Sequence, residues 1–165
     1  VTMPATKTYE ASRIVFAPED TIYGVMTDID RLSLWLLPDG EDVWIDKFDL
    51  RPGGRFRVAF TPADDCPVQA INGRFIDIVS DQQIVQVVEL ESALQGFTGT
   101  MRIIWCLEDV PEGTCLRLAA QDMPPGLDAE WLTRQFEVTL DRLALLVERL
   151  PSASIIYSEA GARPC

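Results

Sequence analysis

The stretch FDLRPGGRFRVAF, residues 48–60, gives the clearest indication of the fold. Phe56, Val58 and Phe60 alternate with arginine and alanine residues, so apolar side chains recur at every second position. Successive side chains of a β-strand point to opposite faces, and this period is typical of a half-buried strand. The stretch therefore predicts a strand that turns one apolar face towards a core.

Two adjacent glycines, Gly53 and Gly54, stand between this strand and the preceding run VWIDKFDL. Glycine has no Cβ, so it adopts positive φ angles without the clash that other residues suffer. Tight connections between antiparallel strands often need such angles. We therefore expect the two runs to be neighbouring antiparallel strands.

The same pattern continues from Val43 to about Asp122, where strand-like segments follow one another along the chain. The short links between them contain Asp, Gly, Pro or Ser, which are typical turn residues. Six consecutive strands joined in this way predict one antiparallel meander. The predicted strands are residues 43–50, 55–61, 68–79, 82–91, 98–108 and 113–122.

Helical segments flank the predicted meander. Residues 7–16 read as a first strand, after which Ala17-Pro18 can open a helix, and a second short helix runs to about Trp35. Residues 128–150 predict one long helix, with Asp128 as its cap and apolar residues at spacings of three and four. We expect one domain over residues 7–150 and a loose tail over residues 151–165.

Two cysteines fall on neighbouring predicted strands. If the turn between these strands is centred between Val110 and Pro111, Cys106 lies directly opposite Cys115 on the outer face. Two interpretations are open for this pair. The thiols are either both reduced, as cytoplasmic compartments keep them, or joined in a cross-strand disulfide.

The composition argues against several kinds of partner. The chain has 165 residues and a net charge of −12, so it would repel a phosphate backbone and an anionic membrane surface. No apolar run approaches the ~20 residues that a membrane helix requires. The first residues contain no positively charged segment that leads into an apolar one, so we expect no signal peptide and a cytoplasmic location.

The sequence has no histidine, which is both the commonest general base and the commonest metal ligand. Ser-His-Asp and Cys-His mechanisms therefore have no base to use. The four cysteines form no CxxC pair, which makes a metal site a weak interpretation. We expect neither a metal nor another cofactor.

The order of elements and four motifs together resemble the helix-grip fold of the SRPBCC superfamily, which includes START domains and polyketide cyclases. The motifs are FAPEDTIYGVMTDIDRLSLW, FDLRPGGRF, GRFIDIVSDQQIV and LEDVPEGTCLRL. More narrowly, the chain resembles the branch named after the activator of heat-shock protein 90 ATPase. The resemblance covers about residues 8–150 and implies an α+β fold, in which a curved antiparallel sheet of about seven strands wraps around a long C-terminal helix.

In this superfamily the space between sheet and helix is a cavity for apolar small molecules, so the resemblance implies a hydrophobic guest here. Plain core packing is the alternative for each apolar residue on the inner face. For Trp35, at the end of the second helix, the alternatives are the cavity mouth and structural packing. The candidate cavity residues are Trp35, Phe56, Val58, Phe60, Arg74, Phe75, Gln86, Val88, Met101, Ile103, Trp105, Leu118, Phe136 and Leu140.

Polar residues on inward phases are the most informative of these, because burying them without a partner costs ~1–3 kcal/mol. Gln86 shares a face with apolar neighbours. If Arg74 is inside, it needs a carboxylate, and Glu89 is one candidate; otherwise it is a solvated outer residue. A β-bulge would exchange the faces of Arg74 and Asp77, so their phase is open.

The resemblance and these residues together imply three candidate functions, of which the third rests on the family name alone. The first is a binding protein for a small hydrophobic molecule. The second is a cyclase- or hydrolase-type enzyme that uses Asp77, Glu89, Arg74 or Tyr23, although Ala120 stands where some family members carry a histidine. The third is a co-chaperone-like partner of heat-shock protein 90. A sheet edge or the apolar patch in the tail could also support a homodimer.

Overall fold

The computed structural model describes residues 7–36, 43–60, 68–92 and 99–149. Within them, a strand, two short helices, six strands and a long helix follow in the predicted order. Their bounds are β1 (Thr8–Val15), α1 (Glu19–Met26), α2 (Leu32–Trp35), β2 (Val43–Phe48), β3 (Arg55–Phe60), β4 (Val68–Val79), β5 (Gln83–Ser92), β6 (Thr100–Val110), β7 (Gly113–Gln121) and α3 (Ala129–Glu148).

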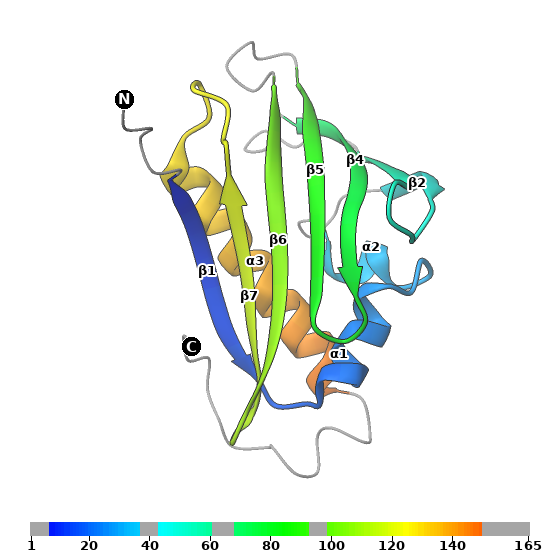
Figure 1. Cartoon of the computed structure of the whole chain (residues 1–165), viewed down its shortest axis with the longest axis vertical. Coiled ribbons are helices and arrows are strands. Elements are labelled where there is room, and N and C mark those ends of the chain that lie inside the picture. Colours follow the sequence, from blue (N-terminus) through cyan, green and yellow to red (C-terminus); the bar gives the residue numbers. More distant parts are fainter. Residues whose placement is uncertain (1–6, 37–42, 61–67, 93–98, 150–165) are drawn as a thin grey trace.

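The strands form one antiparallel sheet in the order β1-β7-β6-β5-β4-β3-β2 (Figure 1). β2 to β7 pair consecutively, which confirms the predicted meander. β1 pairs with β7, so the first strand of the chain lies beside the last. Because the links between β2 and β7 are short, each of these strands pairs with the one before it. This accounts for the consecutive order of the sheet.

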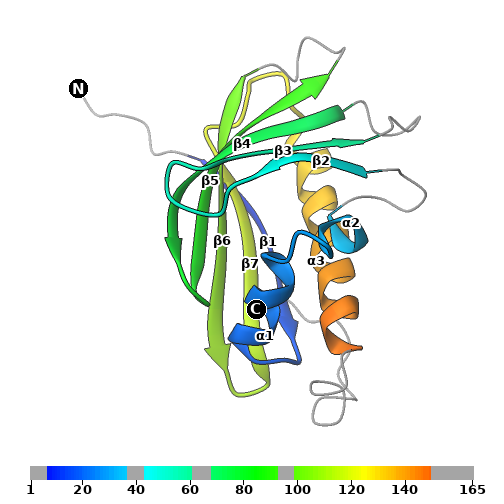
Figure 2. The same cartoon turned by 90° about the vertical axis from the view of Figure 1, so that its right-hand side faces the viewer.

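The sheet curves around α3, as the predicted helix-grip fold requires (Figure 2). α3 lies against β1 and β7, and α1 and α2 lie beside it. The core between sheet and helix contains fully buried side chains from both layers, among them Leu116, Leu140, Leu143 and Val147. Strands β2 to β5 form the other half of the sheet, and their inner face is turned towards the same core.

The start and the buried face of α3 follow from its sequence. The Asp128 side chain accepts a hydrogen bond from the backbone N–H of Glu130 at 3.0 Å, which confirms Asp128 as the cap. The apolar positions fall at spacings of three and four, so they share one face. The buried residues of α3 are Leu132, Phe136, Leu140, Leu143, Ala144 and Val147.

Charged groups join α3 to β1. The Arg13 guanidinium donates to the Asp141 carboxylate at 2.5 Å, and another of its nitrogens lies 3.9 Å from Glu148. A Glu148 oxygen also accepts the backbone N–H of Phe16 at 2.9 Å. Arg13 is buried, whereas the Asp141 side chain is more than half exposed. These contacts fix the direction of α3 across the edge strand.

The two glycines of the β2–β3 connection serve different purposes. Gly53 has a φ of 84°, in the region that glycine tolerates best, and its N–H donates to the carbonyl of Phe75 at 2.7 Å. Gly54 has no positive φ, but a Cβ there would overlap the carbonyl oxygen of Asp49. The prediction of positive φ angles is therefore confirmed for Gly53 and wrong for Gly54, which is needed for close backbone approach.

The β6–β7 turn is displaced by one residue from its predicted position, because it is centred on Pro111 and Glu112. Cys115 consequently lies opposite Glu108 instead of Cys106, so the predicted cross-strand pair is wrong. Cys106 is a free thiol, whereas Cys115 is disulfide-bonded. The structure therefore matches neither of the two alternatives, because only Cys106 of the pair is free and the two are not bonded to each other.

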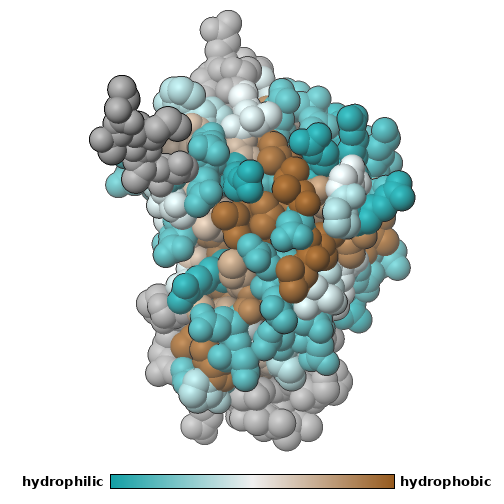
Figure 3. Space-filling model, viewed as in Figure 1, coloured by the Kyte–Doolittle hydropathy of each residue, from teal (hydrophilic) through white to brown (hydrophobic). Residues whose placement is uncertain are grey.

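The outer face of the sheet carries apolar side chains at its centre, which appear brown in the space-filling view (Figure 3). The pairing register places Val85 and Ile104 opposite each other on this face. Acidic and basic residues surround them, including Arg57, which contacts Asp46 and Glu91. None of the helices in the described part of the chain is both long and apolar enough to cross a membrane.

Candidate functional site: an apolar cavity under the curved sheet

A cavity of about 190 Å³ lies between the sheet and the helices α2 and α3. The space that the sequence predicts between these layers is therefore present. Most of its lining is apolar or aromatic. The lining side chains are Met26, Thr27, Leu32, Trp35, Leu36, Phe48, Leu50, Phe56, Val58, Val68, Ile71, Phe75, Ile84, Gln86, Val88, Leu90, Met101, Ile103, Trp105, Leu118, Trp131, Leu132, Gln135, Phe136 and Thr139.

Most of the predicted cavity residues lie in this lining. Leu140 is buried in the core but does not reach the cavity, and Arg74 lies outside it. The side chain of Phe60 is outside the described residues. The predicted residues that line the cavity are Trp35, Phe56, Val58, Phe75, Gln86, Val88, Met101, Ile103, Trp105, Leu118 and Phe136.

A β-bulge in β4 decides the phase that the sequence leaves open for Arg74 and Asp77. β4 and β5 pair in register from Ala70 to Phe75, which lies opposite Gln86, and then Asp77 lies opposite Val85, so Ile76 is the extra residue. The bulge lets Phe75 and Ile78 point towards the core although they are three positions apart. Arg74 and Asp77 are thereby both exposed.

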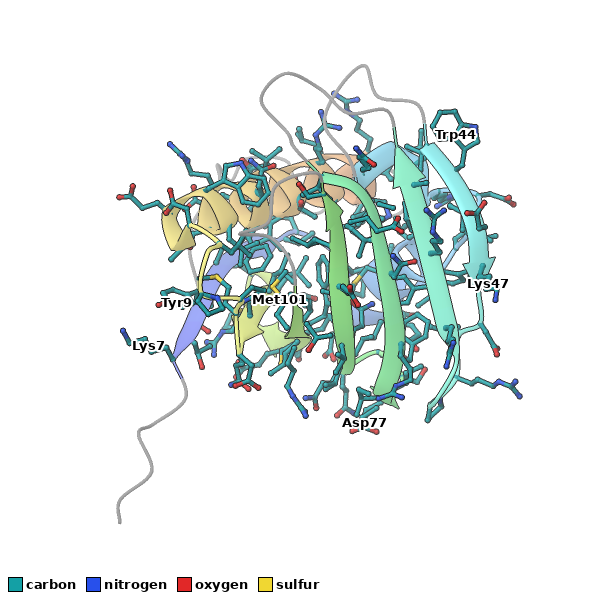
Figure 4. The ribbon with its side chains drawn as sticks, turned by 90° about the horizontal axis from the view of Figure 1, so that it is seen from above. Lys7, Tyr9, Trp44, Lys47, Asp77 and Met101 are labelled. Atoms are coloured by element: carbon teal, nitrogen blue, oxygen red, sulfur yellow. The ribbon has the colours of Figure 1, made fainter. Side chains whose placement is uncertain are left out.

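The other candidates for acid–base chemistry also lie outside the cavity. Glu89 is exposed on β5, and Tyr23 packs against the core without lining the hollow. Figure 4 shows Met101 on the helix side of the sheet, where the cavity lies, and Asp77 pointing away from it. None of the four predicted residues Asp77, Glu89, Arg74 and Tyr23 therefore lines the cavity.

Aromatic rings form the wall of the cavity on β2, β3 and β4. Phe48 meets Phe75 edge-to-face with ring centroids 5.8 Å apart, and Phe56 lies 5.0 Å from Phe75 in a tilted arrangement. Phe56 sits opposite Gly73 on the neighbouring strand, and a Cβ on Gly73 would overlap the Phe56 ring. The missing side chain at Gly73 thus gives the Phe56 ring its place.

A second aromatic pair joins α2 to the sheet. The rings of Trp35 and Trp105 meet edge-to-face, with centroids 5.6 Å apart and planes at 87°. Trp35 is only 3% exposed, and its indole N–H has no hydrogen-bond partner among the described residues. Both rings line the cavity, so Trp35 belongs to the lining as well as to the packing of α2.

Polar groups are few in this lining. Gln86 points inward, as predicted, because it lies opposite Ile103 on β6. Thr27 uses its hydroxyl to donate to the carbonyl of Tyr23 at 2.8 Å. Gln135 and Thr139 contribute from one face of α3. Among the described residues that line the cavity, none carries a charge.

Sequence reasoning missed the lining residues that the helices contribute. Leu32, Trp35 and Leu36 share one side of α2, yet only Trp35 was predicted. In α3, residues 131, 132, 135, 136 and 139 lie on one face at helical spacing, and only Phe136 was predicted. The helical period itself was the signal that could have found them. The described residues contain no group of three or more His, Cys, Asp or Glu side chains that could hold a metal ion.

A curved seven-stranded antiparallel sheet around a C-terminal helix, with an apolar hollow between them, defines the helix-grip class of the SRPBCC superfamily. Residues 16–148 match the sequence model of one of its families, described as Activator of Hsp90 ATPase homolog 1-like protein. The match covers well over half of the chain, so the chain belongs to this family. No curated protein matches it.

Solved structures share the fold. Protein CV1439 from Chromobacterium violaceum is 26% identical with a TM-score of 0.75, covering 86% of this chain and 96% of that one. A protein from Rhizobium leguminosarum is 23% identical with a TM-score of 0.72, covering 88% and 96%. DynU16, a protein in the dynemicin biosynthetic locus, is 17% identical with a TM-score of 0.66, covering 88% of this chain and 48% of its own.

Proposed function

We propose that this protein binds a compact hydrophobic small molecule in the cavity between the curved sheet and α3. The observation that carries the proposal is a hollow of about 190 Å³ with an almost wholly apolar lining. Protein interiors are close-packed and contain few voids larger than a water molecule. The lining atoms of an unfilled void lose dispersion contacts, which an apolar guest would restore.

The volume sets the size of the guest. An engineered cavity of about 150 Å³ is enough to bind benzene, whereas sites for drug-sized ligands measure about 300–1,000 Å³. The present cavity, at about 190 Å³, is closer to the first of these. The guest is therefore a molecule with one or two rings, or a short branched chain, and a sterol would need the walls to move.

Two alternatives from the sequence are less well supported. A carboxylate-based cyclase or hydrolase would need an acid or base beside the guest, and the candidate residues Asp77 and Glu89 are exposed. DynU16 comes from a biosynthetic locus, which is compatible with a role in small-molecule chemistry. Its identity of 17%, however, supports a shared fold and not a shared function. A co-chaperone role rests on the family description, and stimulation of the chaperone's ATPase by the purified protein would test it.

Titration calorimetry with indane, a two-ring hydrocarbon, tests the proposal directly. We expect saturable binding with a negative heat-capacity change, because apolar surface is buried. Val88→Phe should abolish or strongly weaken binding, since Val88 lines the cavity and the larger ring would fill part of it. Val79→Phe is the matched control, because Val79 is exposed on the adjacent strand β4 and should leave binding unchanged.

Even if Val88→Phe folds poorly, titration of the wild-type protein with indane tests the proposal. Absence of binding by indane and by other one- and two-ring hydrocarbons would contradict the proposal. Equal weakening by Val88→Phe and Val79→Phe, with both variants folded, would place the binding site elsewhere and contradict it as well.

A further inference from the structure

We propose that the guest carries a neutral hydrogen-bond acceptor, such as a ketone or ester carbonyl, and that the indole N–H of Trp35 donates to it. The inference rests on the proposed function and names the chemical class of its ligand. Its starting point is one atom: Nε1 of Trp35 is buried, has no partner among the described residues, and belongs to a side chain that lines the cavity. Buried tryptophan N–H groups usually have a partner.

The chemistry of the indole determines whether the guest supplies the donor or the acceptor of the hydrogen bond. The tryptophan Nε1–H is a donor only, so the guest must provide an acceptor. Leaving a buried donor of this kind unpaired costs free energy that an acceptor on the guest would recover. A pure hydrocarbon would fill the cavity and still leave this donor unsatisfied.

The lining also decides the charge of the acceptor. No described lining residue is positively charged, so a carboxylate or phosphate group in the cavity would lose its hydration without gaining a counter-ion. Burying an unpaired anion is far more costly than burying a carbonyl group. The guest is therefore neutral at the end that reaches Trp35.

Trp35 is held in place well enough to select for such a group. It sits at the end of α2, it is 3% exposed, and its ring meets that of Trp105 edge-to-face. A donor fixed on a rigid wall selects a ligand by position, since the acceptor must lie at one place when the apolar body of the guest fills the cavity. Gln86, on the sheet side of the same cavity, is a second polar position that accepts or donates.

A binding cycle tests the inference with two probes that differ in one atom group. Indane and 1-indanone have nearly the same shape, and only the second carries a carbonyl acceptor. We expect Trp35→Phe to weaken binding of 1-indanone about 2- to 10-fold more than binding of indane, the range for one hydrogen bond. Comparing ratios removes the different cost of taking the two probes out of water.

Met101→Leu is the matched control variant. Met101 lines the same cavity, and the swap nearly conserves volume without touching a hydrogen-bond donor. It should change the binding of both probes by the same factor. If Trp35→Phe also weakens both equally, the N–H does not reach the guest, as would be the case if it points at the ring of Trp105, and the inference is wrong.

A second measurement does not depend on the variant being well folded. In wild-type protein labelled with ¹⁵N-tryptophan, saturation with 1-indanone should move the Trp35 indole N–H resonance downfield by more than saturation with indane does. Equal shifts with both probes would overturn the inference while leaving the proposed function intact. If neither probe binds, the proposed function fails, and the inference falls with it.

Discussion

At the scale of single residues, the shape of the cavity wall depends on a glycine, which has no side chain to occupy the space. Gly73 on β4 faces inward, and the ring of Phe56 from β3 occupies the space that a side chain would take. Aromatic residues across from strand glycines shield the exposed backbone and keep the strands in register. The pair therefore shapes the sheet and the hollow together.

Gly73→Ala should move the Phe56 ring, because the added Cβ would overlap it. We expect a loss of about 1–3 kcal/mol in the free energy of unfolding, as for other overpacked sites, together with weaker binding of indane. Urea unfolding measures the first effect and calorimetry the second.

Gly24→Ala is the control, because Gly24 lies in α1 with no atom within 4 Å of an added Cβ. It should leave binding unchanged and raise stability by up to about 1 kcal/mol, since alanine favours a helix more than glycine does. A Gly73→Ala protein as stable as wild type would show that the ring moves aside at no cost, against our expectation.

The surroundings of Cys106 predict how the reactivity of its thiol depends on pH. Burial raises the pKa of the Cys106 thiol, and the nearby Arg117 guanidinium opposes this only in part. Because the thiolate is the reactive form, alkylation of Cys106 should be slow at neutral pH and should reach half its limiting rate above the pH typical of a free cysteine. Iodoacetamide labelling across pH, followed by peptide mass spectrometry, measures this rate.

The denatured protein provides the reference for Cys106. In urea the same peptide should be labelled with an ordinary cysteine profile. A native profile that matches the denatured one would mean that burial does not affect this thiol.

Residue patterns predicted the inner face well where strands are regular. Alternation alone placed Met101, Ile103 and Trp105 on the cavity side, and each lines it. It failed for Arg74, because the bulge at Ile76 changes the phase of β4 without any glycine or proline to mark it. A bulge is set by the pairing of two strands, which a single strand's sequence does not contain.

At the scale of elements, the ion pairs of Arg13 fasten α3 to the edge strand β1. The Arg13 side chain is 10% exposed and the Glu148 side chain 20% exposed, so water screens this group less than a surface pair. Removing the cation would leave Glu148 without an ion pair among the described residues.

Arg13→Met should therefore lower the free energy of unfolding by about 1–3 kcal/mol, less than a fully buried pair because Asp141 remains hydrated. Urea unfolding measures the change. Arg51→Met is the control, since the Arg51–Asp49 pair is 73% and 49% exposed, and exposed pairs contribute less than about 1 kcal/mol. Equal effects of the two variants would refute the special role of Arg13.

The elements themselves were predictable because local signals mark them. Polar links separate the strands, and Asp128 caps α3, so their order was correct and their ends were wrong by only one or two residues. The position of β1 beside β7 was not predicted. It depends on which sheet edge the first strand reaches after the whole meander has formed, and no local pattern encodes that choice.

At the scale of the whole molecule, charge works against compactness. Acidic residues number 26 and basic residues 14, which gives the net charge of −12. Self-repulsion of such a charge destabilises the folded state, and salt screens it. Salt also weakens exposed pairs such as Arg57 with Asp46, but acidic residues exceed basic ones by 12, so we expect the relief of repulsion to dominate.

The melting temperature should therefore be higher in about 0.15 M than in about 0.01 M sodium chloride, because the Debye length falls from about 30 Å to about 8 Å. Differential scanning calorimetry measures the shift. Choline chloride should give the same shift, since screening depends on ionic strength. A melting temperature that falls with salt would mean that ion pairs outweigh repulsion.

The cavity under the sheet should affect how the stability of the fold responds to hydrostatic pressure. Unfolding lets water into internal voids, so the unfolded chain occupies less volume, by about 20–100 mL/mol in typical proteins. The cavity of about 190 Å³ should add to this volume change, which scales with the internal void that unfolding removes. Compression should therefore unfold the empty protein at modest pressures, as tryptophan fluorescence under pressure would record, and a saturating guest should raise the midpoint. A midpoint unmoved by indane would mean that the bound molecule leaves the compressible space unfilled.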